Sequence, residues 1–165
     1  MQMKSATPAS NALSALTLRS FEAPGFLTSL KTELLDCTWW RSTYRLLAPL
    51  VYVTNVPTGS PRLIYVPGDF VTDLASVPRL PLVFFLVGNI GHESAVVHDW
   101  LYRQQIYPKD VCDKIFYEAL LANNNPGVLA YMMYMGVKVG GGPTFERYAS
   151  ILREVEESEK LHRVQ

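Results

Sequence analysis

The fold of this chain is decided by residues 91–122, which read GHESAVVHDWLYRQQIYPKDVCDKIFYEALLA. Apolar residues recur at helical spacing between Gly91 and Gln105, and this pattern predicts a first helix. Pro108 suits the first turn of a second helix from Lys109 to about Ala122, where Asp110 adds negative charge at the N-terminal end. Because the connector is short, we expect the two helices to pack antiparallel.

Strand-like segments precede this helix pair, and two further helices follow it. Aromatic and β-branched residues predict strands at Thr38–Tyr44, Leu47–Val53 and Leu63–Val66. A third helix, about Val128–Val139, is apolar nearly all round and is expected to be buried. A final helix from Phe145 to about Leu161 carries a charged surface pattern. The sequence therefore predicts an α+β fold, with a small antiparallel sheet in the N-terminal half followed by a three- to four-helix C-terminal half.

Length and composition limit the domain count and the partners. We expect residues 1–20, rich in Ser, Ala and Thr, to form a flexible arm ahead of a single globular domain over residues 21–165. The 15 basic and 15 acidic residues balance, so no nucleic-acid partner is expected. The apolar runs are too short to span a bilayer, and no signal peptide is recognised. Cys37 and Cys112 are expected to be buried and reduced.

The helix pair also carries the residues best suited to chemistry. His98 and Tyr102 are four positions apart and share a helix face. If the turn centres near Ile106, position 99 lies opposite position 113, so Asp113 is expected beside His98 and Asp99. A carboxylate on one imidazole nitrogen fixes the tautomer and leaves the other nitrogen as a base for water. We therefore expect His98 to be the base, Asp113 to orient it, and Tyr102 to bond Asp113. Asp99 is then available as a ligand for a hard cation such as Ca²⁺, which polarises an ester carbonyl.

This constellation resembles the phospholipase A2 motif, in which His-Asp-x-x-Tyr on one helix meets an aspartate on its antiparallel partner. The shared residues are His98, Asp99, Tyr102 and Asp113. The resemblance implies calcium-dependent hydrolysis of a lipid ester, with phospholipid as the partner molecule. Two features depart from that family. Its calcium is held partly by carbonyls of a glycine-rich loop, for which this chain offers only Gly88-Asn89-Ile90-Gly91, and its secreted members depend on disulfides.

A second resemblance covers more of the chain. The strings are Thr72-Asp73-Leu74-Ala75-Ser76-Val77-Pro78-Arg79, then His98-Asp99-Trp100-Leu101-Tyr102, then Asp113-Lys114-Ile115-Phe116. In this order they resemble an uncharacterised protein family common in tailed bacteriophages and prophages. The resemblance implies a phage origin, and therefore a place in the bacterial host cytoplasm or in the phage virion. It implies no activity.

Several residues have more than one interpretation. Asp73 either caps the turn that follows it, pairs with Arg79, or supports the site near His98. Arg103 either neutralises Asp99, binds an anionic head group, or lies on the surface. His98 itself is either a base or a core histidine in a structural polar network. Two functions follow: a phage-encoded hydrolase acting on lipid esters, and a non-enzymatic virion or tail-associated protein that the same cluster braces.

Overall fold

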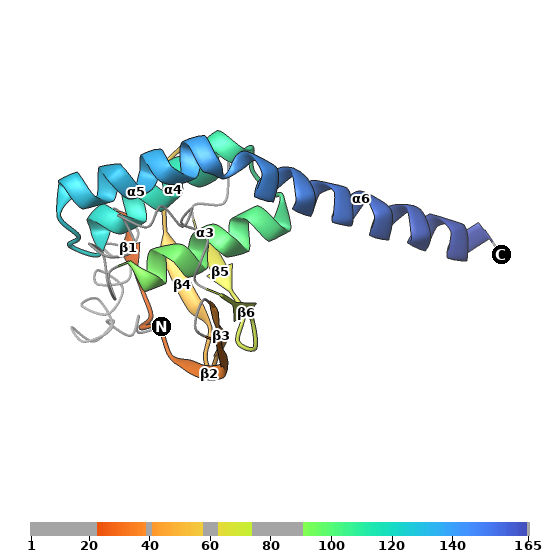
Figure 1. Ribbon diagram of the computed structural model, residues 1–165, viewed down its shortest axis with the longest axis horizontal. Helices are drawn as coiled ribbons and strands as arrows, with labels where there is room; N and C mark the ends of the chain where they lie inside the picture. Colours follow the sequence, from red (N-terminus) through yellow and green to blue (C-terminus); the bar gives the residue numbers. More distant parts are fainter. Residues whose placement is uncertain (1–22, 39–40, 58–62, 74–90, 165) are drawn as a thin grey trace, which may run out of the picture.

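The structure, a computed structural model, describes residues 23–38, 41–57, 63–73 and 91–164. The predicted arm at residues 1–20, Arg79 with most of its string, and residues 88–90 lie outside the described residues. The described strands precede the described helices along the chain, as Figure 1 shows. The predicted α+β arrangement is therefore confirmed.

The strands form two antiparallel sheets rather than the one that was predicted. The first has three strands in the order β1 (Gly25–Phe26), β4 (Leu50–Val53) and β5 (Leu63–Val66). The second has the order β2 (Thr32–Thr38), β3 (Arg41–Leu46) and β6 (Val71–Thr72). In β5 the side chains alternate, so that Ile64 and Val66 are buried while Tyr65 points outward, as the two-residue period of a strand requires.

In the described residues four helices follow the strands: α3 (His92–Gln104), α4 (Lys109–Ala122), α5 (Gly127–Gly140) and α6 (Gly142–Val164). The bounds of α3 and α4 confirm the prediction to within a residue at each end. Gly91 precedes α3 with a φ of 79°, and a Cβ there would lie 2.6 Å from Leu120 Cδ2, so this position requires glycine.

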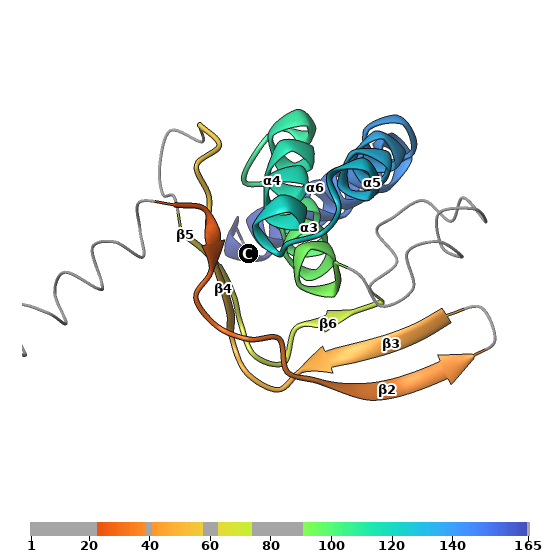
Figure 2. The same cartoon turned by 90° about the vertical axis from the view of Figure 1, so that its left-hand side faces the viewer.

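Helix α3 occupies the centre of the molecule. In Figure 2 it lies between the strands on one side and α4 and α5 on the other. Its residues Val97 and Leu101 join a core cluster with Leu50 and Val66 of the first sheet. Ala95 joins a second cluster that contains side chains of α4 and α5. The side chains that α3 presents to α4 are therefore enclosed, and this enclosure sets the environment of the site.

Two predictions about the helices were wrong. Helix α5 is not buried all round, because it packs against α4 along one face that contains Ala130 and Met133, whereas Tyr131 and Val139 are exposed. The glycine-rich break at residues 140–142 does not delay α6 to Phe145, since a proline is tolerated in the first turn of a helix. The far part of α6 projects from the body (Figure 1).

Two further corrections concern the N-terminal half. The predicted strand Thr38–Tyr44 covers the end of β2 and the start of β3, so it contains a chain reversal that strand propensity does not locate. Cys37 is exposed on β2, whereas Cys112 is buried as predicted, and the two cysteines do not form a disulfide. Among the described helices, none is long and apolar enough to cross a membrane.

Candidate functional site

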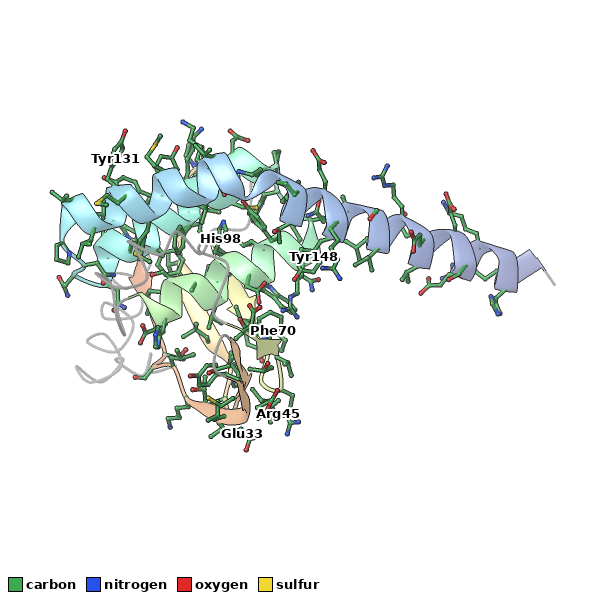
Figure 3. The ribbon with its side chains drawn as sticks, viewed as in Figure 1. Glu33, Arg45, Phe70, His98, Tyr131 and Tyr148 are labelled. Carbon is green, nitrogen blue, oxygen red and sulfur yellow. The ribbon has the colours of Figure 1, made fainter. Side chains whose placement is uncertain are left out.

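The antiparallel packing of α3 and α4 brings His98 and Asp113 together. His98 Nε2 lies 3.0 Å from Asp113 Oδ1, and the Tyr102 hydroxyl donates to the same oxygen at 2.6 Å. His98 is fully buried, and Asp113 is 1 % exposed. Figure 3 labels His98 in the layer between α3 and the helices that cover it. The structure thus joins three of the predicted site residues in one hydrogen-bonded cluster.

Lys109 completes the cluster, although it was not among the predicted site residues. Its ammonium donates to Asp113 Oδ2 at 2.7 Å and to the backbone carbonyls of Val137 and Lys138 at 3.0 and 3.1 Å. An ammonium has three N–H donors, so these three bonds use all of them. The sequence could have indicated the contact between Lys109 and Asp113, because Lys109 stands four positions before Asp113 at the start of the second predicted helix.

Burial and the hydrogen bonds of the cluster determine the protonation states of Asp113 and His98. Burial raises the pKa of Asp113, but hydrogen bonds from His98, Lys109 and Tyr102 outweigh it, so the pKa lies below its ordinary value. Burial also holds the pKa of His98 below its ordinary value, although Asp113 favours the protonated ring. At neutral pH the site therefore pairs an ionised Asp113 with a neutral His98.

The tautomer of His98 follows from this pairing. An ionised carboxylate only accepts hydrogen bonds, so Nε2 must carry the proton that Asp113 receives. Nδ1 is then the nitrogen with the free lone pair. It is buried and has no hydrogen-bond partner among the described residues. A carboxylate-oriented imidazole with an open second nitrogen is the arrangement of a general base.

Asp99 has different partners from those of His98. Arg103 donates to both of its oxygens, from Nη2 at 3.0 Å and from Nε at 3.3 Å. Burial raises the pKa of Asp99, while Arg103 and a hydrogen bond from Thr72 oppose that rise. Of the interpretations of Arg103, neutralisation of Asp99 agrees with these contacts. Arg103 also stacks over the ring of Phe70, 4.9 Å from its centroid.

The remaining predicted residues are Asp73 and Arg79, which were expected to support the site, and Asp99 as a possible calcium ligand. Asp73 follows β6, and its charge is close enough to raise the pKa of Asp99. Arg79 lies outside the described residues. Within the described part of the chain, no group of three or more His, Cys, Asp and Glu side chains could hold a metal ion. Calcium binding by Asp99 stays a prediction.

A cavity approaches the cluster from the side of Asp113. It has a volume of about 530 Å³ and lies against α4 and α5. Its lining side chains are all charged or phenolic: Lys109, Asp110, Asp113, Lys114, Tyr134 and Lys138. The cavity therefore reaches Asp113 and Lys109, but His98 is not part of its lining.

Glu118 forms a second polar cluster that sequence reasoning missed. It accepts hydrogen bonds from the hydroxyls of Thr54 at 2.6 Å and Tyr52 at 3.0 Å, and from the backbone N–H of Asn55. Burial, followed by the charge of Glu118, raises the pKa of Tyr52. These bonds tie α4 to the end of β4, so they hold the helix that carries Asp113 against the first sheet.

The chain was compared with known proteins. A family model described as "Protein of unknown function (DUF1353)" matches residues 44–137, which is more than half of the chain. The matched residues include all of α3 and α4 and therefore the whole His98 cluster. No curated protein and no solved structure matches the chain. The expectation of an uncharacterised family agrees with this match, whereas the phage origin stays a prediction.

Proposed function

Since the chain belongs to the DUF1353 family, whose function is unknown, we propose a function from the site itself. The protein is a phage-encoded hydrolase in which His98 activates water to attack an ester, and a phospholipid is the best substrate. One observation carries the proposal: His98 Nε2 is held by Asp113, while Nδ1 is buried and unpartnered among the described residues.

The reaction uses His98 twice. Nδ1 takes a proton from water as the water oxygen bonds to the carbonyl carbon of the ester. The bond between that carbon and the alkoxy oxygen then breaks, and the same proton passes from Nδ1 to the departing alcohol. Asp113 stabilises the imidazolium that exists between these two transfers, and the fixed Nε2–H bond keeps Nδ1 directed at the water.

The neighbours of Asp113 maintain this function. Tyr102 and Lys109 each donate to it, so the carboxylate is fixed in orientation and stays ionised. The lowered pKa of His98 keeps the ring unprotonated at neutral pH, which is the state that a base requires.

Calcium belongs to the proposal only through the resemblance to phospholipase A2. Both oxygens of Asp99 already accept hydrogen bonds from Arg103, so Arg103 would have to release them before Asp99 bound a cation. The donors among the described residues do not fit a calcium site, and no step of the proposed reaction passes through the metal. Assays with added Ca²⁺ and with EDTA decide whether Asp99 has that role.

The test is hydrolysis of phospholipid vesicles by the purified full chain. We expect the wild type to release fatty acid and His98→Gln to lose at least about a hundredfold in rate, as removal of a general base does. His162→Gln, which changes an exposed histidine on α6, is the matched control and should keep full activity. Absence of release from every phospholipid offered would overturn the hydrolase.

One observation favours a second candidate, a non-enzymatic virion or tail-associated protein that contacts other virion proteins. His98 is fully buried, and the bonds of Asp113 join α3, α4 and, through Lys109, α5. In that case His98→Gln would remove only a brace and cost about 1–3 kcal/mol of stability. The melting temperature would fall by several degrees, and no hydrolysis would be seen in any variant.

A further inference from the structure

Ser94 lies one turn before His98 on α3 and was not among the predicted site residues. Both residues are fully buried. Ser94 Oγ and His98 Nδ1 are the two buried side-chain atoms that have no hydrogen-bond partner in the part of the chain that the structure describes. Buried polar groups are normally paired, and each exception has a structural or functional cause. That both exceptions stand four positions apart on one helix indicates a shared cause.

The helix geometry brings the two atoms within reach of one small ligand. Residues four apart on a helix share a face, with Cβ atoms about 5–6 Å apart. Side chains lean toward the N-terminus, so the ring of His98 leans over the turn that carries Ser94. A water molecule that bonds both groups spans two hydrogen bonds of roughly 2.8 Å each, which suits two side chains at this helical spacing.

The surroundings favour one ordered water over bulk solvent. The ring of Phe116 lies 4.8 Å from the ring of His98, and the ring of Tyr102 lies 4.1 Å from it. The hydroxyl of Tyr102 is already bonded to Asp113. A water in such an enclosed site is ordered when it has two or more polar partners, and Ser94 with His98 supplies two.

We infer that Ser94 and His98 hold one water molecule between them, and that this water is the nucleophile of the reaction. The second half of the inference rests on the proposed function, whereas the first half does not. The water donates one O–H to His98 Nδ1 and accepts the O–H of Ser94. One lone pair of the water oxygen then remains for the carbonyl carbon. Ser94 is a positioning residue, because it keeps its own proton throughout.

The experiment compares Ser94→Ala with the wild type and with Ser150→Ala. Ser150 is a matched control, since it is also a helical serine but its hydroxyl bonds a carbonyl of its own helix at 2.8 Å. Crystal structures should show a water bonded to Ser94 Oγ and His98 Nδ1 in the wild type, and should lose it in Ser94→Ala. In phospholipid hydrolysis, kcat of Ser94→Ala should fall on the order of tenfold or more while KM stays constant.

Thermal unfolding supplies a readout that does not depend on activity. If Ser94 Oγ is bonded to a water, removal of the hydroxyl in Ser94→Ala should lower the melting temperature. If the hydroxyl is unsatisfied, alanine should raise it, because a buried unpaired group is removed. A raised melting temperature together with no water in the wild-type structure overturns the inference.

The outcomes separate this inference from the function it extends. A bridging water in a protein that hydrolyses no ester would overturn the hydrolase and leave the water site standing. Hydrolysis that depends on His98 but is unchanged in Ser94→Ala would overturn the role of Ser94 and leave the hydrolase standing.

Discussion

Acid should destabilise this protein in a pH window that His98 sets, because the ring is buried without a charge. Burial holds the pKa of His98 in the folded protein below its ordinary value of 6.5. The unfolded chain has no such burial, so there His98 titrates near 6.5. Below that pH the unfolded state binds a proton that the folded state lacks, and the free energy of unfolding falls as the pH falls. The contribution of His98 is complete above pH 6.5.

The magnitude follows from the linkage of one proton. Each pH unit below 6.5 costs at most about 1.4 kcal/mol, so the protein should be up to about 2 kcal/mol less stable at pH 5 than at pH 7.5. The pKa of Asp113 is lowered below 3.8, so stability from Asp113 is lost only in stronger acid. Asp99 acts in the opposite direction, since burial raises its pKa and protonation favours the folded state as the pH falls toward 3.8. Asp113 and Asp99 are present both in the wild type and in His98→Gln. Their contributions therefore cancel when the pH dependence of the two proteins is compared.

The assay is urea unfolding at pH 5.0, 6.0 and 7.5 for the wild type, His98→Gln and His162→Gln. We expect the wild type and His162→Gln to lose stability in parallel as the pH falls. His98→Gln should be less stable at pH 7.5 and nearly insensitive to pH in this window. If His98→Gln kept the slope of the wild type, the buried neutral His98 would not be its source and the reasoning would be refuted.

Two other substitutions test the supports of the cluster. A Cβ at Gly141 would lie 2.5 Å from the hydroxyl of Tyr102, so Gly141→Ala should cost about 1–3 kcal/mol in thermal unfolding, whereas Gly127→Ala, at a position with nothing within 4 Å, should not destabilise. Glu118→Ala removes the bonds that tie α4 to the end of β4 and should cost about 1–3 kcal/mol in thermal unfolding, so an unchanged melting temperature would contradict this role of Glu118.

The helix pair was predictable because its signals are local. Pro108 and the Asn-rich segment after Ala122 fix the ends of α4, and the predicted range agrees with the structure. The short connector then leaves one register, in which Asp113 faces the turn that carries His98. Spacing alone therefore predicted that contact.

The strands were less predictable because their pairing is not local. Propensity marked residues 38–44 as one strand, although the chain reverses there to pair β2 with β3. Likewise, the sequence of α5 is apolar on all sides, and only its position outside α4 leaves Tyr131 exposed. Neither the division into two sheets nor the exposed face of a helix can be read from residue types.

Two residues of the site that were not predicted could have been found from their spacing in the sequence. Lys109 and Ser94 each stand four positions before a predicted site residue on the same helix, where side chains meet. Lys109 is an ion-pair partner at that spacing, but Ser94 is informative only once its burial is known. The pairing of Asp99 with Arg103 is also a local contact at that spacing, whereas the hydrogen bond from Thr72 comes from a distant strand and could not be predicted locally.

The balance of buried charge bears on both candidate functions. At neutral pH Lys109 compensates Asp113, Arg103 compensates Asp99, and the ring of His98 is uncharged. A structural brace needs Nδ1 to be paired, as it would be with the water inferred above, because an unpaired buried nitrogen destabilises the fold. A base requires a lone pair on Nδ1 that accepts the proton, and it also requires nearby negative charge that stabilises the resulting imidazolium. Asp113 and Asp99 both favour the protonated ring, while burial and Lys109 oppose it. The cluster thus keeps His98 neutral at rest, and in the proposed reaction the two carboxylates would stabilise its transient cation.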